Sequence, residues 1–303
     1  MLKSEDLRGI FVPVVTPFSP DDSLDLQSYD RYAGSLLDHG IQGLVINGTT
    51  GEAPTVSWEE VRELVRRTKA VLAGKGRSIP VVVGTGTNDT RSTASRTEQA
   101  GALGADAALV VVPYYSRPSQ AGIIEHFRRA SRAGVPVIAY EVPSRTGVSL
   151  SADTAAAILE LDGVVGLKDS SGGTELFAAL KRMGVSKPVL CGDDKHFLAM
   201  LSLGAAGGIV ASANLRTETF VETCRLIRDG HAARAASAFD SLAPLIELLF
   251  RDSNPAPLKW LLAQQGILAS GALRLPLLPI SEELQRQLAK ELKPSASEID
   301  GGR

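Results

Sequence analysis

The sequence repeats one pattern, in which an amphipathic polar segment and a glycine-containing turn lead into a short apolar run. The apolar runs are rich in Val and Ile and almost uninterrupted, as is typical of parallel strands covered on both faces. Strands that alternate with helical segments form βα units, and these units build a parallel sheet. In chain order, the runs are GIFVPVVTPF, GLVINGTTGE, IPVVVGTGTN, AALVVVPYYS, VPVIAYEVPS, VVGLKDSS, KPVLCGDD and GGIVASAN.

Eight such units are complete by about residue 230, which predicts an α/β fold of the (β/α)8 TIM barrel type. An open doubly wound sheet is the alternative. It is disfavoured because no strand is followed by the dinucleotide-binding glycine pattern, and GTGTND at Gly84 lacks the third glycine. A GxxxxGK[ST] phosphate-binding loop is absent as well.

The alternation stops after residue 230, where three stretches are typical of helices separated by Pro- and Gly-containing turns. The sequence therefore predicts a catalytic barrel over residues 1–230 and a helical C-terminal region over residues 231–303 that packs on the barrel. The final stretch, PSASEIDGGR, is small and polar, and we expect it to be frayed.

Composition argues against several classes of function. The formal net charge is -2, so no basic excess favours nucleic acid or an anionic membrane surface. Cys191 and Cys224 are the only cysteines, too few for a disulfide framework, which suits a reducing compartment. The start, MLKSEDLRGIFVPVV, does not resemble a signal peptide, and no apolar stretch approaches the ~18 residues that span a bilayer. We expect a cytoplasmic protein with no nucleic-acid or membrane partner.

Lys168 ends the run VVGLKDSS, where a lysine is unusual because an unpaired ammonium is expensive to desolvate. In a barrel, the carboxyl ends of the strands and the loops after them form the active-site face. The lysine therefore either marks where the strand reaches water or is a nucleophile kept partly neutral by its surroundings. Other polar and reactive side chains at strand ends are Thr49, Thr50, Tyr114, Tyr115, Tyr140, Arg145, Asp193 and Asp194.

Each of these side chains also has an ordinary structural explanation. Thr49 and Thr50 could be turn residues, or part of an anion-binding nest of backbone N–H groups. At least one of Asp193 and Asp194 is expected to cap the helix that follows it. No histidine pair has the spacing of a metal site, so we expect no metal and surface roles for the histidines. These are His39, His126, His196 and His231.

A lysine, tyrosines, threonines and an arginine at one mouth together predict Schiff-base catalysis, in which the amine attacks a ketone and acidifies the adjacent carbon. Free lysine has a pKa of about 10.4, so roughly one amine in a few thousand is neutral at pH 7. Burial of Lys168 and a nearby Arg145 would lower that pKa. Tyr140 could relay protons, Thr50 with its neighbouring N–H groups could hold a carboxylate, and Arg145 could bind a second one.

GTTGE, PYY, Y-x-VPSRTG and GLKDSSG, in this order, resemble the pyruvate-dependent class I aldolases, the family of dihydrodipicolinate synthase and N-acetylneuraminate lyase. The likeness extends from VTPF in the first strand to NPAPLKW in the C-terminal helices. The resemblance implies that Lys168 forms a Schiff base with pyruvate and that Tyr140 is the general acid and base. It also implies a proton relay of Tyr140 with Thr49 and with Tyr115, donated by a neighbouring subunit.

The resemblance further implies that Thr50 binds the pyruvate carboxylate and that Arg145 binds the carboxylate of L-aspartate 4-semialdehyde. Gly192 and Ile209 would lie beside the bound pyruvate. The implied reaction condenses the two substrates to 4-hydroxy-tetrahydrodipicolinate, on the route to lysine and diaminopimelate, with no metal or cofactor. The implied assembly is a homotetramer, with a dimer as the alternative.

Two positions depart from the family pattern. Glu141 stands where asparagine is common, and strand alternation predicts that it faces away from Tyr140. The second departure lies in the pocket where some members of the family bind lysine as an inhibitor. An apolar Val61 and a neutral Ser92 cannot bind a lysine ammonium as a carboxylate would, so we expect weak or absent inhibition by lysine. The matching positions here include Trp58, Val61, Asn88, Ser92 and Tyr114.

Two other functions remain open at this point. One is a related aldolase or dehydratase acting on a 2-oxo-3-deoxy sugar acid or 4-hydroxy-2-oxoglutarate. Arg145 disfavours the sugar acids, whose polyol tail would replace the second carboxylate. The other is a barrel that binds a keto acid without turning it over, as a sensor or scaffold. The joint presence of the lysine, tyrosines, threonines and arginine disfavours that function, which the fold by itself would not exclude.

Overall fold

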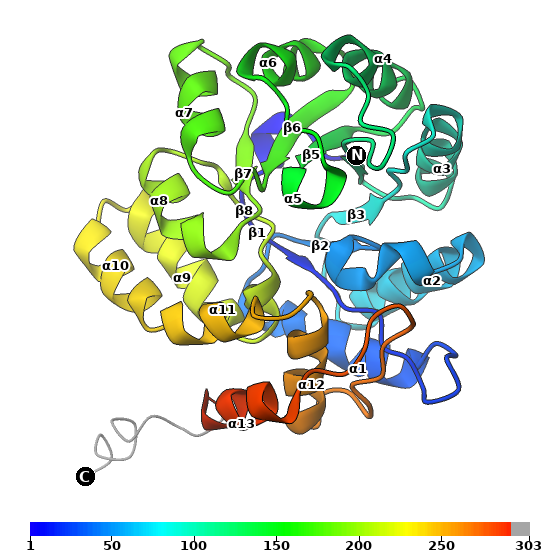
Figure 1. The fold of residues 1–303 in the computed structure, drawn as a ribbon, viewed down its shortest axis with the longest axis vertical. Helices are drawn as coiled ribbons and strands as arrows, with labels where there is room; N and C mark the ends of the chain where they lie inside the picture. The colour runs from blue at the N-terminus through cyan, green and yellow to red at the C-terminus, as the bar shows by residue number, and fades with distance from the viewer. Residues whose placement is uncertain (292–303) are drawn as a thin grey trace.

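The computed structural model describes residues 1–291, so the stretch predicted to be frayed lies outside the described residues. Within residues 1–291, eight parallel strands close a barrel in chain order, which confirms the predicted (β/α)8 architecture. Helices surround the strands as a ring (Figure 1). The strands are β1 (Gly9–Pro13), β2 (Gly43–Ile46), β3 (Val81–Gly84), β4 (Ala107–Val111), β5 (Val137–Glu141), β6 (Val164–Asp169), β7 (Val189–Cys191) and β8 (Gly207–Gly208).

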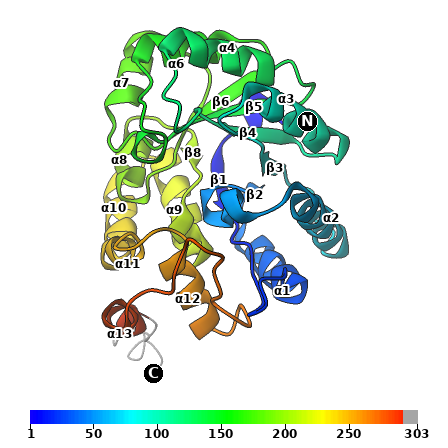
Figure 2. The ribbon, with the colours of Figure 1, turned by 45° about the vertical axis from the view of Figure 1, so that its right-hand side comes forward.

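The C-terminal helices lie against one side of the barrel rather than in the ring, with α10 packed on α9 and α12 beside α1 (Figure 2). Among residues 1–291, no helix is both long and apolar enough to traverse a lipid bilayer. The helices of the ring are α1 (Leu26–Leu36), α2 (Trp58–Gly74), α3 (Thr90–Ala102), α4 (Gln120–Ala130), α6 (Ala152–Glu160), α7 (Glu175–Arg182), α8 (Phe197–Ser202) and α9 (Thr217–Arg228). The short helix α5 (Pro143–Thr146) lies inside the ring, in the loop after β5. The C-terminal helices are α10 (Ala232–Asp240), α11 (Ala243–Leu249), α12 (Ala256–Gln264) and α13 (Glu282–Glu291).

Most of the strands are apolar on both faces because they separate two hydrophobic clusters. Phe11, Val45 and Leu190 belong to the smaller cluster inside the barrel, whereas Val12 belongs to the larger one between strands and helices. The interior is filled by side chains, as in other eight-stranded barrels. Gly43 is required beside Phe11, because a Cβ at that position would overlap the phenylalanine ring.

A buried ion pair joins the C-terminal helices to the barrel. Lys259 of α12 and Glu52, which follows β2, are 2.7 Å apart, and both side chains have 0% exposure. The ammonium also donates to the carbonyl of Thr16 at 2.9 Å and lies 4.3 Å from the centre of the Phe18 ring. Burial lowers the pKa of Lys259, and the charge of Glu52 opposes that effect. The pair therefore holds two segments that are far apart in the sequence.

We expect Lys259→Met to reduce the free energy of unfolding by about 3–5 kcal/mol, because it leaves the Glu52 carboxylate buried without its partner. Lys75→Met is the matched control, since Lys75 pairs with Asp38 at 2.6 Å on the surface. A pair of that kind contributes about 0–1 kcal/mol. Chemical denaturation of the two variants beside the parent protein measures the difference, and equal losses in both would contradict the expectation.

Candidate active site

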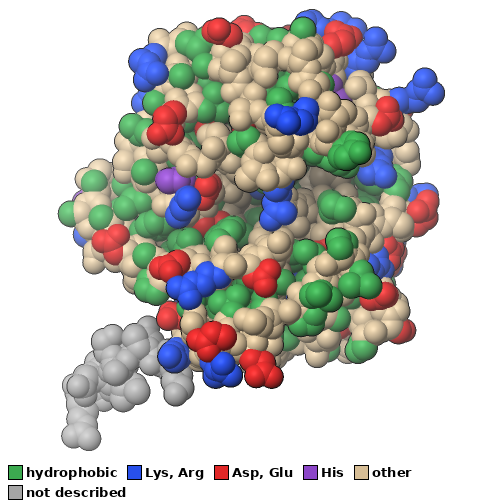
Figure 3. All heavy atoms as spheres, viewed as in Figure 1, with side chains coloured by type: hydrophobic (Ala, Val, Ile, Leu, Met, Phe, Trp, Pro, Cys, Tyr) green, Lys and Arg blue, Asp and Glu red, His purple; other side chains and the backbone are tan. Residues whose placement is uncertain are grey.

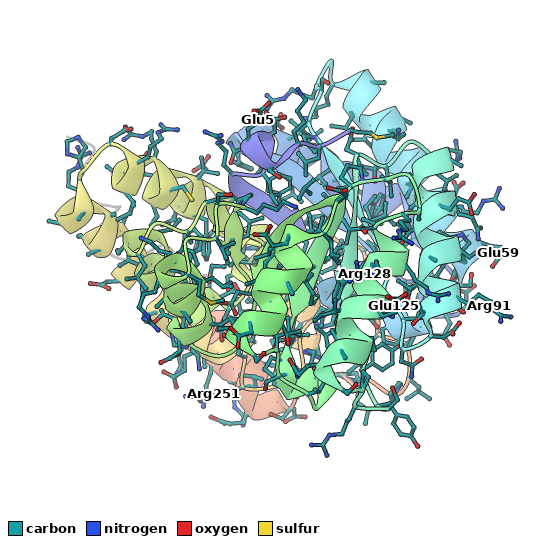
Figure 4. All side chains as sticks on the ribbon, turned by 90° about the horizontal axis from the view of Figure 1, so that it is seen from above. Glu5, Glu59, Arg91, Glu125, Arg128 and Arg251 are labelled. Atoms are coloured by element: carbon teal, nitrogen blue, oxygen red, sulfur yellow. The ribbon has the colours of Figure 1, made fainter. Side chains whose placement is uncertain are left out.

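A cavity of about 610 Å³ opens at the carboxyl ends of the strands. Figure 3 shows this face hollowed near its centre, with basic side chains at the edge. In Figure 4, Arg251 at the cavity edge and Glu5 before β1 lie at opposite ends of the molecule. The cavity brings together seven of the eight site residues expected from the sequence. These are Thr49, Thr50, Tyr140, Arg145, Lys168, Gly192 and Ile209.

Lys168 is buried near the end of β6, directly opposite Tyr140 of β5 in the strand register. Its Nζ lies 4.1 Å from the centre of the Tyr140 ring. Gly192 follows β7 and leaves room for the lysine, since a Cβ there would come within 2.7 Å of Lys168 Cε. The amine is therefore held between a phenol and a backbone that has no side chain.

The environment of Tyr140 suits a group that exchanges protons. Burial raises the pKa of its phenol, but the positive charges of Lys168 and Arg145 and the hydroxyls of Thr49 and Ser170 act in the opposite direction. The net effect holds the pKa of Tyr140 below its ordinary value of 10.0. A phenol whose pKa is closer to neutrality donates and accepts a proton more readily.

Thr49 and Thr50 begin a 3-10 turn, η3 (Thr49–Gly51), immediately beyond β2. Their N–H groups have no acceptor inside the turn because they are its first residues. The Thr50 side chain is buried, and its Oγ1 accepts a hydrogen bond from Asn254 Nδ2 at 3.0 Å. Thr16 Oγ1 donates to the carbonyl of Gly51 at 2.7 Å and holds the turn against β1.

Arg145 lies on the short helix α5, in the loop after β5, with its side chain exposed. It lines both the first cavity and a second cavity of about 630 Å³. The two cavities also share Thr49, Tyr140 and Asn254. A hydrogen bond joins the two ends of the loop that carries α5: Glu141 Oε1 accepts from the N–H of Leu150 at 2.9 Å. An anion entering the mouth would therefore meet this guanidinium before it reached Lys168.

Tyr115 is the one expected site residue that does not line the cavity. Its side chain is 88% exposed, and its φ of 68° is in the left-handed region that non-glycine residues rarely adopt. Within this chain, the tyrosine is therefore not brought together with Tyr140 and Thr49.

Two expectations about ordinary residues are wrong. Asp193 occupies the N-cap position of the 3-10 turn Asp194–His196, but its carboxylate makes no capping hydrogen bond, and the N-cap of α8 is His196. Instead, the two carboxylate oxygens of Asp194 accept from the N–H groups of Ala211 and Ser212 at 3.0 and 2.8 Å. Burial raises the pKa of Asp194 to about 6, although those hydrogen bonds and the charge of Lys168 oppose the rise. The Asp194 carboxylate thus binds N–H groups in the segment after β8 rather than those of the helix next to it in sequence.

His126 of α4 is buried, which contradicts the surface role expected for it. Its Nδ1 lies 3.0 Å from Thr90 Oγ1, and its ring meets Phe127 edge-on. Burial lowers the pKa of His126 to about 4, so the ring is neutral at physiological pH. The prediction of a surface role was wrong because α4 also has a solvent-exposed face, where Glu125 and Arg128 lie side by side (Figure 4).

The sequence analysis did not single out three parts of the cavity wall. Ser170 follows Lys168 by two residues, and Asn254 precedes α12. The third part is an apolar side formed by the C-terminal helices, which includes Phe239, Ile246 and Phe250. Only the NPAPLKW motif pointed to this region, because a helix that packs from outside the barrel has no strand end to reveal it.

Glu141 and Asp169 are buried neighbours on the face of the sheet away from Lys168. They are paired in the register of β5 and β6, one position beyond Tyr140 and Lys168. Burial raises the pKa of Glu141 to about 7; the bond from Leu150 opposes the rise and the charge of Asp169 adds to it. Burial also raises the pKa of Asp169. Glu141 is not one of the described residues that line the cavity. This agrees with the expectation that successive side chains of a strand point to opposite faces of the sheet.

Comparison with known proteins gives consistent matches along the chain. The model of the dihydrodipicolinate synthetase family matches residues 6–295. The 4-hydroxy-tetrahydrodipicolinate synthase of Thiobacillus denitrificans is 42% identical over 93% of this chain and 94% of its own length. The protein of the same name from Methanothrix thermoacetophila is 38% identical over 97% of this chain and 98% of its own.

A solved structure of similar shape is the dihydrodipicolinate synthase of Acinetobacter baumannii in complex with pyruvate. It is 36% identical, covers 94% of this chain and 98% of that one, and superposes with a TM-score of 0.90. The similarity thus includes the barrel, the cavity-lining loops and the C-terminal helices.

We expect Glu141→Gln to remove a pH dependence from the stability. Because the folded-state pKa of Glu141 lies above the ordinary 4.5, the fold favours the protonated carboxyl. Its stabilisation is complete below about pH 4.5 and is lost as the pH rises through 7. Between about pH 5 and about pH 8, the variant should gain up to about 3 kcal/mol relative to the parent protein.

The measurement is the unfolding free energy of both proteins across that pH range. Glu59→Gln is the control, because Glu59 lies exposed in the first turn of α2 (Figure 4). Stability profiles that stay parallel for the parent protein and Glu141→Gln would show that Glu141 is ionised throughout.

Proposed function

The chain belongs to the dihydrodipicolinate synthetase family, and from that membership we propose how its cavity works. The enzyme is a lyase of the pyruvate-dependent class I aldolase type. It condenses pyruvate with L-aspartate 4-semialdehyde to 4-hydroxy-tetrahydrodipicolinate, a step of lysine and diaminopimelate biosynthesis. The shared name of relatives from several species favours this reaction over a sugar-acid aldolase or dehydratase.

One observation supports the proposed chemistry most strongly: a buried primary amine, Lys168, lies against a phenol at the bottom of an open cavity. The Lys168 side chain lines the cavity, where the ketone carbon of a 2-oxo acid could reach it, and a primary amine that attacks a ketone forms an iminium. Thr50 and Arg145 line the same cavity at positions suited to two carboxylates.

In the first half of the proposed reaction, Lys168 Nζ attacks the C2 carbonyl carbon of pyruvate, and water leaves to give an iminium. Tyr140 donates the proton that the departing hydroxyl needs and later recovers one. The hydroxyl and N–H of Thr50 hold the pyruvate carboxylate. Gly192 and Ile209 lie beside the methyl group of pyruvate. Loss of a proton from C3 then gives an enamine.

In the second half, the enamine carbon bonds to the aldehyde carbon of L-aspartate 4-semialdehyde, whose oxygen takes up a proton. Arg145 holds the carboxylate of this second substrate as a bidentate partner. The amino group of the adduct then attacks the iminium carbon and closes the ring. Lys168 leaves as the free amine. The proton released by the attacking amino group passes to it through Tyr140 and Thr49.

We also propose that the enzyme works in the cytoplasm as a homotetramer, or as a dimer, in which Tyr115 completes the proton relay of a neighbouring subunit. The exposure of its side chain supports this role, because a phenol extended into solvent is free to enter another cavity. An isolated chain would then have an incomplete relay.

Incubation with pyruvate followed by borohydride should add mass to Lys168, because reduction converts the iminium to a stable secondary amine. Peptide mapping locates the adduct. Lys168→Ala should form none, whereas Lys195→Ala, which removes an exposed amine from the same cavity, should retain it. A folded protein that forms no adduct in excess pyruvate would contradict both the synthase reaction and the alternative of a related aldolase or dehydratase. Turnover of L-aspartate 4-semialdehyde beside a panel of sugar acids then separates the two.

We expect lysine at sub-millimolar concentration to leave the rate unchanged. Ser92 lines the second cavity, Val61 is buried, and the Arg96 guanidinium lies 5.7 Å from the centre of the Trp58 ring, where it would repel an ammonium. The nearby carboxylate of Asp89 already accepts from the N–H groups of Arg91 and Ser92. A rate assay at increasing lysine tests this, and inhibition below the millimolar range would contradict it.

A further inference from the structure

Asn254 connects the C-terminal helices to the anion-binding turn. It immediately precedes the Pro255 cap of α12, and its Nδ2 donates to Thr50 Oγ1 at 3.0 Å across 204 residues of sequence. It is half-buried and lines both cavities. No step of the proposed reaction uses it directly.

The chemistry of the two groups gives this hydrogen bond a direction. A hydroxyl has one hydrogen to donate and two lone pairs that accept, whereas an amide nitrogen only donates. When Asn254 occupies a lone pair of Thr50 Oγ1, the hydroxyl hydrogen is left to point elsewhere. The remaining space beside this buried hydroxyl is the cavity that contains Lys168. A carboxylate, which only accepts, matches a hydroxyl in this state.

We propose that Asn254 is a positioning residue, whose amide fixes the Thr50 hydroxyl as a donor aimed at the carboxylate of pyruvate. This inference rests on the proposed function, because it assigns the carboxylate of the first substrate to Thr50. Asn254 acts through Thr50 and does not need to touch the substrate.

The anchoring of α12 supports this role. Lys259, five residues after Asn254, is held by Glu52 at 2.7 Å and by the Thr16 carbonyl at 2.9 Å. Thr16 in turn donates to Gly51, the last residue of η3. The segment that carries Asn254 and the turn that carries Thr50 are thus joined at independent points. A fixed separation between them keeps the amide within reach of the hydroxyl.

The test compares Asn254→Ala with Asn254→Asp by steady-state kinetics. Aspartate keeps the shape of asparagine but only accepts, so it would take the Thr50 hydrogen for itself. We expect Asn254→Asp to raise the KM for pyruvate about tenfold or more, since a hydrogen bond to a charged group is lost. Asn254→Ala should raise it by a few fold. In both, kcat at saturating pyruvate and the KM for the aldehyde should change much less.

Two controls separate positioning from a general loss of structure. Gln264→Ala removes an exposed amide from the end of α12, the helix that Asn254 precedes, and should leave both KM values unchanged. In a Thr50→Val background, Asn254→Ala should have no further effect on the KM for pyruvate, because the hydroxyl that it orients is gone. A structural role would instead add to the effect of Thr50→Val and would change kcat and the aldehyde KM together.

The inference is overturned if both Asn254 variants keep the parent KM for pyruvate, or if their effect persists in full without the Thr50 hydroxyl. Borohydride trapping distinguishes this from failure of the proposed function. If the parent protein forms no adduct with pyruvate, the proposed function fails. If the parent and Asn254→Asp proteins are labelled at the same pyruvate concentrations, only the role of Asn254 fails.

Discussion

The buried ion pair between Lys259 and Glu52 is the interaction on which the arrangement of the site most depends. Two charges without access to water are stable only together, so the pair fixes α12 against the turn after β2. Glu52 also accepts from the N–H of Arg274 at 3.2 Å, and the Arg274 guanidinium covers the Phe18 ring at 4.2 Å. The C-terminal helices are therefore part of the wall of the cavity, because the same attachment brings Asn254 to Thr50.

Barrel closure supplies the other half of the site. Because all strands are parallel, their carboxyl ends converge, and the register of β5 against β6 brings Tyr140 beside Lys168. The same register places Glu141 beside Asp169 on the opposite face, where two buried carboxyls have raised pKa values. One pairing thus sets two environments: an amine beside a phenol at the cavity, and two neighbouring buried carboxyl groups on the opposite face of the sheet. A one-residue slip would exchange them.

Much of the fold and part of the site follow from local patterns in the sequence. Continuous apolar runs alternating with amphipathic segments predict the parallel barrel, and Lys168 at the end of such a run predicts the active-site face. Strand alternation also places Glu141 outside the cavity, as the structure has it. The predictions for His126 and for Asp194 failed because they used neighbours in sequence. His126 is decided by the packing of α4, and Asp194 by N–H groups that follow another strand.

The sequence by itself determined the barrel, which of its ends is the active-site face, and the reactive groups at that end. Hydrophobic periodicity and residue type suffice for these because they act over a few neighbouring positions. Tertiary structure alone decided which groups meet. Asn254 reaches Thr50, and Lys259 reaches Glu52, across more than 200 residues. Tyr115, in the loop after β4, does not line the cavity of its own chain, whereas Tyr140 of β5 does. Such contacts depend on how helices and loops pack once the barrel has closed, and that packing leaves no periodic signal in the sequence.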